Sequence, residues 1–168
     1  MKIVDCNLEH AAVLRELLNP YITDSTAVFK DRPLDASTAE AWVRGKLDDR
    51  QPILGAVADD GRLMGFATYG PFRSQAGFRH TVEHSVWVSA AFQRRGIGRS
   101  LLEALIERAR LQRHHVMIGA IDFANQPSLN LHEQLGFVRS ARLRQVGFKF
   151  GQWRDLCLVQ RVLDAPSS

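Results

Sequence analysis

Apolar residues in the first part of the chain follow two different periods. They recur every three or four positions, as on the buried face of a helix, at residues 8–18 and 36–47. They form continuous or alternating runs, as in strands, at residues 2–5, 53–58, 63–69 and 81–88. Asp60-Gly61 is typical of a tight hairpin between two of these strands. Pro20, with the polar residues after it, is expected to end the first helix.

The rest of the chain continues with helices and strands in alternation. A third helix is predicted after Gly98 and a fourth over residues 126–135, where Asn125 is a suitable N-cap and Gly136 a suitable stop. Strands are predicted at residues 115–121, 137–146 and 153–162. The order β-α-α-β-β-β-α-β-α-β-β differs from a doubly wound Rossmann pattern. It favours an α+β fold, a three-layer α/β/α sandwich around a mixed, mostly antiparallel sheet.

Composition narrows the class of protein. The chain has 168 residues, 45% apolar and 24% charged, which suits one globular domain at residues 1–163 with a flexible tail at 164–168. A formal charge of +4, without a long basic stripe that contains aromatic residues, argues against nucleic acid as a partner. No apolar run resembles a signal peptide or a membrane span, so a cytoplasmic protein with no membrane partner is expected. Cys6 and Cys157 match no metal-binding or redox spacing.

A glycine-rich turn before the third helix carries the clearest functional signal. Gly96 and Gly98 would let the backbone approach an anion, and Arg94 and Arg95 would add positive charge beside the N–H groups at the helix start. The turn lacks the third glycine of a dinucleotide fingerprint and the Gly-Lys-Ser/Thr of a Walker loop. A different pyrophosphate ligand fits the pattern, although a tight turn without any ligand would use the same residues.

Two spaced motifs resemble those of a known family. Gln93-x-x-Gly96-x-Gly98, after Val86-Trp87-Val88, resembles the acetyl-CoA signature of the GNAT superfamily of N-acetyltransferases. Asn125-x-x-Ser128-x-x-Leu131-His132-x-x-x-Gly136-Phe137 resembles the later helix and strand of that family. The resemblance implies acetyl-CoA as a co-substrate, bound by Val86, Trp87, Val88, Arg94, Arg95, Gly96, Ile97, Gly98, Arg99 and Asn125.

Further stretches are similar to one branch of this superfamily, the phosphinothricin and methionine sulfoximine N-acetyltransferases. They are residues 21–29, 81–85, 120–122, 131–133 and 146–153, so the similarity extends over nearly the whole chain. It implies acetyl transfer to the α-amino group of a small amino-acid-like substrate, such as phosphinothricin, methionine sulfoximine or methionine sulfone. It also implies a homodimer.

Glu83 and His132 are the candidate catalytic residues. Glu83 interrupts an apolar strand, where a carboxylate with a raised pKa can accept a proton, and alternation places it opposite His84. His132 stands where many family members carry a tyrosine that protonates the leaving thiolate, and imidazole can act as an acid near neutral pH. A salt-bridged surface Glu83 and a packed core His132 are the structural alternatives. No nucleophile elbow is present, so direct attack by the amine is expected.

The candidate substrate-binding residues are Phe29, Arg73, Ser74, Gln75, Glu83, His84 and Ser85. Arg73 lies in the loop after the second meander strand, and its guanidinium suits a carboxylate or a phosphinate. An exposed arginine without a ligand is the alternative. Lys149 and Trp153 belong to a Gly-rich hairpin that is a candidate wall of the same pocket, in this subunit or its neighbour. Phe29 and Trp153 could otherwise be a core aromatic pair.

Other functions stay open from the sequence. No metal is expected, because the histidine pairs at 80/84 and 114/115 have no convincing third ligand. The acceptor could be another amine, such as a polyamine or a protein N-terminus. The chain could also be a CoA-binding module that retains the fold without catalysis.

Overall fold

The computed structural model describes residues 1–163, and the predicted tail at residues 164–168 lies outside the described residues. Within them, strands and helices follow the predicted order. The strands are β1 (Lys2–Asp5), β2 (Ile53–Val57), β3 (Leu63–Pro71), β4 (Thr81–Val88), β5 (Val116–Asp122), β6 (Val138–Lys149) and β7 (Gln152–Val162). The α-helices are α1 (Ala11–Asp24), α2 (Ala36–Asp48), α3 (Ile97–Leu111) and α4 (Gln126–Gln134), with short 3-10 turns η1 (Leu8–His10), η2 (Ala76–Phe78) and η3 (Ala90–Phe92).

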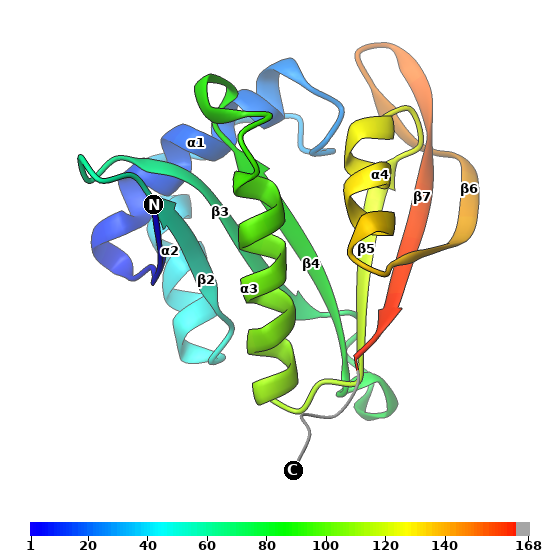
Figure 1. Cartoon of the computed structure of the whole chain (residues 1–168). Coiled ribbons are helices and arrows are strands. Elements are labelled where there is room, and N and C mark those ends of the chain that lie inside the picture. Colours follow the sequence, from blue (N-terminus) through cyan, green and yellow to red (C-terminus); the bar gives the residue numbers. More distant parts are fainter. Residues whose placement is uncertain (164–168) are drawn as a thin grey trace.

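One sheet with the strand order β1-β2-β3-β4-β5-β7-β6 forms the middle layer. Neighbouring strands are antiparallel, except for β4 and β5, which are parallel. Helices α1 and α2 cover one face, and α3 and α4 cover the other (Figure 1). Alternate residues of β2 serve both cores, since Ile53 packs with α1 and α2 whereas Leu54 packs with α3. The predicted three-layer fold around a mixed, mostly antiparallel sheet is confirmed.

Strands β4 and β5 separate along part of their length. Thr81–Glu83 pair with Val116–Ile118, and in the described chain the pairing of these two strands ends there. Strand β4 stays paired with β3 as far as Val88, and β5 stays paired with β7 as far as Asp122. The parallel junction therefore opens into a wedge between residues 84–88 and residues 119–122.

Helix α1 runs through Pro20 to Asp24, so the expected helix end at this proline is wrong. A proline inside a helix removes a backbone hydrogen bond and typically costs about 3 kcal/mol. Burial of Ile22, which is 2% exposed, and a hydrogen bond from Tyr21 to Val88 stabilise the last turn. These tertiary contacts outweigh the local signal, and they bring Tyr21 against the open part of β4.

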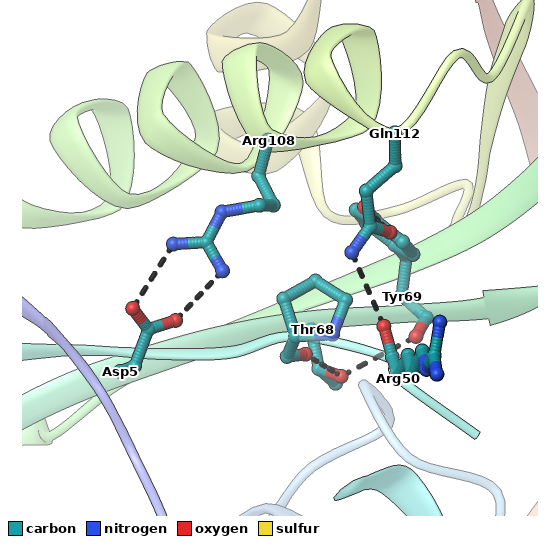
Figure 2. A network of polar contacts seen from close by, with 7 residues as sticks. Asp5, Arg50, Thr68, Tyr69, Arg108 and Gln112 are labelled. Carbon is teal, nitrogen blue, oxygen red and sulfur yellow. Dashed lines mark hydrogen bonds and ion pairs between the residues drawn. The ribbon is translucent and has the colours of Figure 1, made fainter. Parts of the chain in front are cut away.

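Polar contacts fix the C-terminal end of α3 to β1, to β3 and to the turn before β2 (Figure 2). Arg108 donates to both carboxylate oxygens of Asp5, at 2.7 and 3.1 Å. The Tyr69 hydroxyl donates to Gln112 Oε1 at 2.7 Å, and Gln112 Nε2 donates to Arg50 O at 3.2 Å. Strands β1 and β3 and the turn before β2 are thereby joined to one helix end, away from the wedge.

The hairpin of β6 and β7 is longer than the strands predicted at 137–146 and 153–162. Its register shifts between Leu143 and Gly147, where Gln145 has a φ of 55°. A bulge of this kind inserts unpaired residues and increases the local bend of a strand. Beyond it, the hairpin continues to Lys149, which reaches the last turn of α1 and the loop after it.

Candidate active site

A cleft of about 580 Å³ lies in the wedge between β4 and β5, a size suited to a small-molecule ligand. Its walls come from both strands, the glycine turn, the first turn of α3 and the exposed side of α4. The predicted cofactor-binding residues that line it are Val86, Trp87, Val88, Arg94, Gly96, Ile97, Gly98, Arg99 and Asn125. The structure therefore brings together residues separated by almost 40 positions in the sequence, between Val86 and Asn125.

The glycine turn enters the cleft through left-handed backbone. Arg94 and Gly96 have φ angles of 59° and 79°, and α3 starts at Ile97. The positive φ explains glycine at position 96, where an added Cβ would meet no atom within 4 Å. Gly98 has no positive φ, and an added Cβ would make an ordinary contact 3.5 Å from Leu131 Cδ2. Packing does not require glycine there, but a Cβ would occupy space in the cleft.

The arginines around this turn have different surroundings. Arg99 donates to Gln134 Oε1 at 2.6 Å and to Glu103 Oε1 at 3.4 Å, so its guanidinium is already partly paired. The guanidinium of Arg95 lies over the Phe92 ring at 5.5 Å from its centroid, and Arg95 does not line the cleft. Arg94 is exposed and lines the cleft. With the N–H groups at the start of α3, it offers positive charge to an anionic ligand.

Tyr21 is a cleft residue that the sequence argument did not select. Its hydroxyl donates to Val88 O at 2.5 Å and accepts a hydrogen bond from Val88 N at 3.2 Å. Gln93 Nε2 donates to the same hydroxyl at 3.2 Å. A signal existed, because Tyr21 begins one of the stretches similar to the subfamily. Because the helix was expected to end at Pro20, Tyr21 was not expected to lie near Val88 of β4.

Asn125 and His132 lie near the two ends of α4. Asn125 Oδ1 accepts from Ser128 N at 3.2 Å, which confirms it as the helix N-cap. His132 is buried, with Nδ1 2.7 Å from Ser128 O and Nε2 2.8 Å from His84 Nε2. Burial lowers the pKa of His132, and the hydrogen bond to Ser128 O acts in the opposite direction. His132 is thus a packed histidine and a cleft residue at the same time.

Glu83 lies on the opposite face of the sheet from His132. Val82 belongs to the core under α3 and α4, so alternation turns Glu83 toward the face that carries α1 and α2. Burial raises the pKa of Glu83, and the charge of Arg73 opposes this rise. Glu83 does not line the cleft, but it is the last residue of β4 that pairs with β5. It therefore stands where the strands begin to separate.

The predicted substrate residues fall into two groups. His84 and Ser85 line the cleft, and His84 is buried against His132, on the face opposite Glu83 as alternation predicts. Phe29, Arg73, Ser74 and Gln75 are exposed outside it, and the Arg73 guanidinium lies 5.0 Å from the centroid of the Phe72 ring. The structure thus does not gather these residues in one pocket of a single chain, and their role in substrate binding stays a prediction.

The loop after α1 is held by the β6–β7 hairpin. Lys149 is buried and donates to Ile22 O at 2.6 Å and to Val28 O. The Phe29 ring lies directly on Gly147, where an added Cβ would be 2.5 Å from Phe29 Cε1. Lys149 is thus an anchor for this loop and does not line the cleft between β4 and β5, and its place in a substrate pocket of this subunit or its neighbour stays a prediction.

Phe29 and Trp153 do not form a core aromatic pair. Phe29 and Trp153 are 37% and 63% exposed, so the alternative of a core aromatic pair is wrong. Trp153 stacks instead with Phe148, with 4.8 Å between ring centroids, and it does not line the cleft.

Over residues 1–163, no group of three His, Cys, Asp or Glu side chains could hold a metal ion. Within the same range, no helix is long and apolar enough to cross a membrane.

Comparisons with known proteins agree with this geometry. The model of the acetyltransferase (GNAT) family matches residues 12–137. An L-methionine sulfoximine/L-methionine sulfone acetyltransferase of Pseudomonas paraeruginosa is 43% identical, over 90% of this chain and 88% of its own. A phosphinothricin N-acetyltransferase of Streptomyces viridochromogenes is 34% identical, over 93% and 84%. A putative acetyltransferase from Salmonella typhimurium, solved with its cofactor acetyl-CoA, superposes with a TM-score of 0.94 at 38% identity, over 100% of this chain and 96% of that one.

Proposed function

Because this chain belongs to the acetyltransferase (GNAT) family, we propose that it transfers the acetyl group of acetyl-CoA to the α-amino group of a small amino-acid-like substrate. Methionine sulfoximine, methionine sulfone and phosphinothricin represent the substrate class, on the strength of the relatives' names. The observation that carries the proposal is the cleft at the β4–β5 separation, which joins an unpaired strand edge to the start of a helix.

The cleft offers what each part of acetyl-CoA requires. Beyond Glu83, β4 has no strand partner on the β5 side in the described chain, so the Val86–Val88 stretch would offer backbone groups to the amide groups of the pantetheine arm. The Tyr21 hydroxyl already bonds to Val88 N and O, so the arm would pair first with Val86. The pyrophosphate would lie at the start of α3, where Gly98 leaves room and Arg94 adds charge. Asn125 lines the same wall and is available to the arm as well as to Ser128.

The acceptor amine would approach from the face that carries Glu83. A free α-amino group has a pKa of about 8, so part of it is already neutral at physiological pH. Glu83, with its raised pKa, would accept a proton from the amine directly or through water. Arg73, whose charge acts on Glu83, would pair with the carboxylate or phosphinate of the substrate.

Direct attack by the amine fits the surroundings of the cysteines. Cys6 and Cys157 are buried and neither lines the cleft. Burial raises the pKa of the Cys6 thiol to about 11, and the negative charge of Asp5 adds to the effect. A thiol of this kind is protonated at neutral pH and is a poor nucleophile. A covalent acyl-cysteine intermediate is therefore not part of the proposal.

The test is acetyl-CoA turnover, followed as thiol release, across methionine sulfoximine, methionine sulfone, phosphinothricin, spermidine and an alanine-initiated peptide. We expect turnover with the first three compounds. Preferred turnover of spermidine or the peptide would overturn the acceptor class while leaving acetyl transfer intact. Binding of acetyl-CoA by calorimetry, without transfer to any amine, would indicate a CoA-binding module instead.

We also propose that the protein acts as a homodimer through the β6–β7 hairpin. Four of its apolar side chains are strongly exposed, at 55 to 63%: Val146, Phe148, Phe150 and Trp153. An exposed apolar patch of this kind is typical of an interaction surface. Light scattering should give twice the chain mass for the wild type and a monomer for Trp153→Lys, while Leu111→Lys, at an exposed position on α3, should leave the dimer intact. A wild-type monomer would overturn this part of the proposal.

A further inference from the structure

Two buried histidines meet in the wall of the cleft. His84 of β4 and His132 of α4 are 5% and 4% exposed, and their Nε2 atoms lie 2.8 Å apart. The ring of Phe137 packs against both, with centroid distances of 5.3 and 5.2 Å. An added Cβ on Gly119 of β5 would stand 2.6 Å from His84 Cε1, so this glycine makes room for the ring. The packing holds the two rings in one relative position.

The outer nitrogen of each ring bonds to a backbone carbonyl. His84 Nδ1 lies 2.7 Å from Ile118 O, and His132 Nδ1 lies 2.7 Å from Ser128 O. A carbonyl oxygen accepts hydrogen bonds and never donates them. Each Nδ1 atom must therefore carry a proton, which assigns the tautomer of both rings.

The contact between the two Nε2 atoms then needs a proton of its own. A neutral imidazole carries one N–H, and here it is used at Nδ1 of each ring. Two neutral rings would place two lone pairs 2.8 Å apart, which is repulsive. Three hydrogen bonds in a row require three N–H protons, and a pair of rings that has bound one extra proton carries three. The geometry is that of a singly protonated pair.

We infer that His84 and His132 share one proton between their Nε2 atoms and act together as the acid that protonates the leaving thiolate. This inference rests on the proposed acetyl transfer. His132 is the member on the family motif, and His84 is the partner that positions it and shares its proton. Neither ring alone is the titrating group, because two sites this close lose protons in steps that belong to the pair.

The charges around the pair favour a single proton over two. Burial and the charge of His132 lower the pKa of His84, which disfavours a second proton on the pair. Burial lowers the pKa of His132 too, so retention of the first proton depends on the short Nε2 contact and on both carbonyls.

Titratable groups lie on several elements packed against the two rings. Tyr69 of β3 is the cross-strand neighbour of His84, and burial raises its pKa, so it stays neutral. Glu83 of β4 is on the other face of the sheet and faces Arg73. Asp122 of β5 is paired with Arg154, and Glu133 of α4 with Arg139. Cys157 of β7 has a pKa raised by burial and stays neutral. The neighbouring carboxylates thus have cationic partners of their own, and the shared proton is held chiefly by the two rings and their carbonyls.

The proton balance of the transfer closes with this assignment. The amine attacks the thioester carbonyl and loses a proton, and the C–S bond then breaks with its electron pair going to sulfur. The thiolate replaces one of the two Nε2 atoms as acceptor of the shared proton, and the sulfur leaves as the thiol. The pair, now with one N–H at each Nδ1, takes back one of the two protons that the substrate ammonium released. The other proton enters the solvent.

Nitrogen NMR of the resting protein tests the shared proton without any turnover. The chain has six histidines, and ring-¹⁵N labelling distinguishes protonated from unprotonated nitrogens. At about pH 7 we expect both Nδ1 atoms of the pair to be protonated and the two Nε2 signals to lie between the two classes. His84→Gln and His132→Gln assign the signals. Two unprotonated Nε2 atoms in the folded wild type would overturn the inference.

The use of the proton in catalysis is tested by the pH profile of kcat/KM. The wild type should lose rate at high pH as the pair releases its proton. His84→Gln should lower kcat by about 10- to 100-fold and move or remove this descending limb, with the Kd of acetyl-CoA changed less than about twofold. Phe137→Leu, which disturbs the packing but no nitrogen, should keep the limb. An unchanged profile in folded His84→Gln would contradict the role of His84. No transfer by the wild type would contradict the proposed function, while the NMR result would still stand.

Discussion

The two ends of the β4–β5 junction differ in what their backbone and side chains bond to. At the closed end, Thr81–Glu83 pair with β5, and α3 is fixed to the sheet through Arg108 and Gln112. At the open end, the facing strand edges have no strand partner in the described chain, and the adjoining turn uses left-handed backbone. The same helix, α3, runs along both ends. Stability can therefore be concentrated at one end while the other keeps groups available for a ligand.

The comparison also separates two neighbouring residues of one strand. His84 is buried toward α4 with its ring nitrogens bonded, whereas Glu83 is exposed on the other face near Arg73. Strand alternation places the proposed proton donor and the proposed proton acceptor on opposite sides of the junction. In the proposed reaction, Glu83 would accept a proton from the amine on one side, and the histidine pair would donate a proton to the leaving thiolate on the other.

The largest effect is expected from the closed end, with Leu105→Ala. Leu105 is completely buried, and its loss should lower the free energy of unfolding by about 2–5 kcal/mol. Leu111→Ala on the same helix, at a site 64% exposed, should change it by less than about 0.5 kcal/mol. Urea unfolding measures the free energy of unfolding of both variants. The affinity of the folded protein for acetyl-CoA should not change in either variant. A loss of affinity in Leu105→Ala would show that the two ends are coupled.

Glu83→Gln should lower kcat/KM by about 10- to 100-fold near pH 6.5, where most of the amine is protonated. The deficit should shrink near pH 9, because an α-amine with a pKa of about 8 is then neutral without a base. The pH profile of acetyl transfer measures this, with Glu40→Gln, at an exposed position on α2, as the control. Equal losses at every pH would argue against a base.

The same substitution has a predictable effect on stability. The pKa of Glu83 is raised in the folded protein, so its contribution to stability is present below the unfolded pKa and is lost as pH rises through the folded one. Glu83→Gln should therefore not lower the melting temperature at pH 7–8. A clear decrease would mean that the carboxylate is paired in a way that stabilises the fold.

Gly98→Ala should weaken acetyl-CoA binding by about tenfold, which corresponds to about 1.4 kcal/mol. Its stability should stay equal or rise, since alanine is the better helix former and the Cβ fits against Leu131. Gly45→Ala, in open space on α2, should leave binding unchanged. Gly96→Ala is the contrasting variant, because its φ of 79° should make it less stable. Calorimetric titration and thermal unfolding distinguish the three, and unchanged affinity in Gly98→Ala would contradict the cradle.

The smallest effect is expected from Tyr21→Phe, which removes the hydroxyl that bonds to Val88. The loss of about 1 kcal/mol should appear as a KM for acetyl-CoA raised by about fivefold, with kcat unchanged. Tyr69→Phe removes a comparable hydrogen bond, to Gln112, at the closed end and should leave KM unaffected. Equal KM changes in both variants would mean that Tyr21 acts only through general stability.

Local signals predicted most of the fold and the cofactor side of the cleft. Hydrophobic periodicity and caps such as Asn125 depend on neighbours within a few positions, so they can be predicted from the sequence. The glycine turn before α3 could be predicted for the same reason. The helix end at Pro20 was predicted wrongly because the contacts that extend α1 come from Val88, far away in sequence. The contacts of Lys149 with Ile22 and Val28 were not predicted, because they join residues more than 120 positions apart in the sequence.

The sequence by itself determined the order of the elements, the family and the residues of the acetyl-CoA signature. Tertiary structure alone decided that β4 and β5 separate after Glu83, that Tyr21 reaches Val88, and that His84 meets His132. The physical reason is the range of the forces involved. Periodicity and capping act within one or two turns of chain, whereas strand separation and a contact between two buried rings depend on packing between elements far apart in sequence.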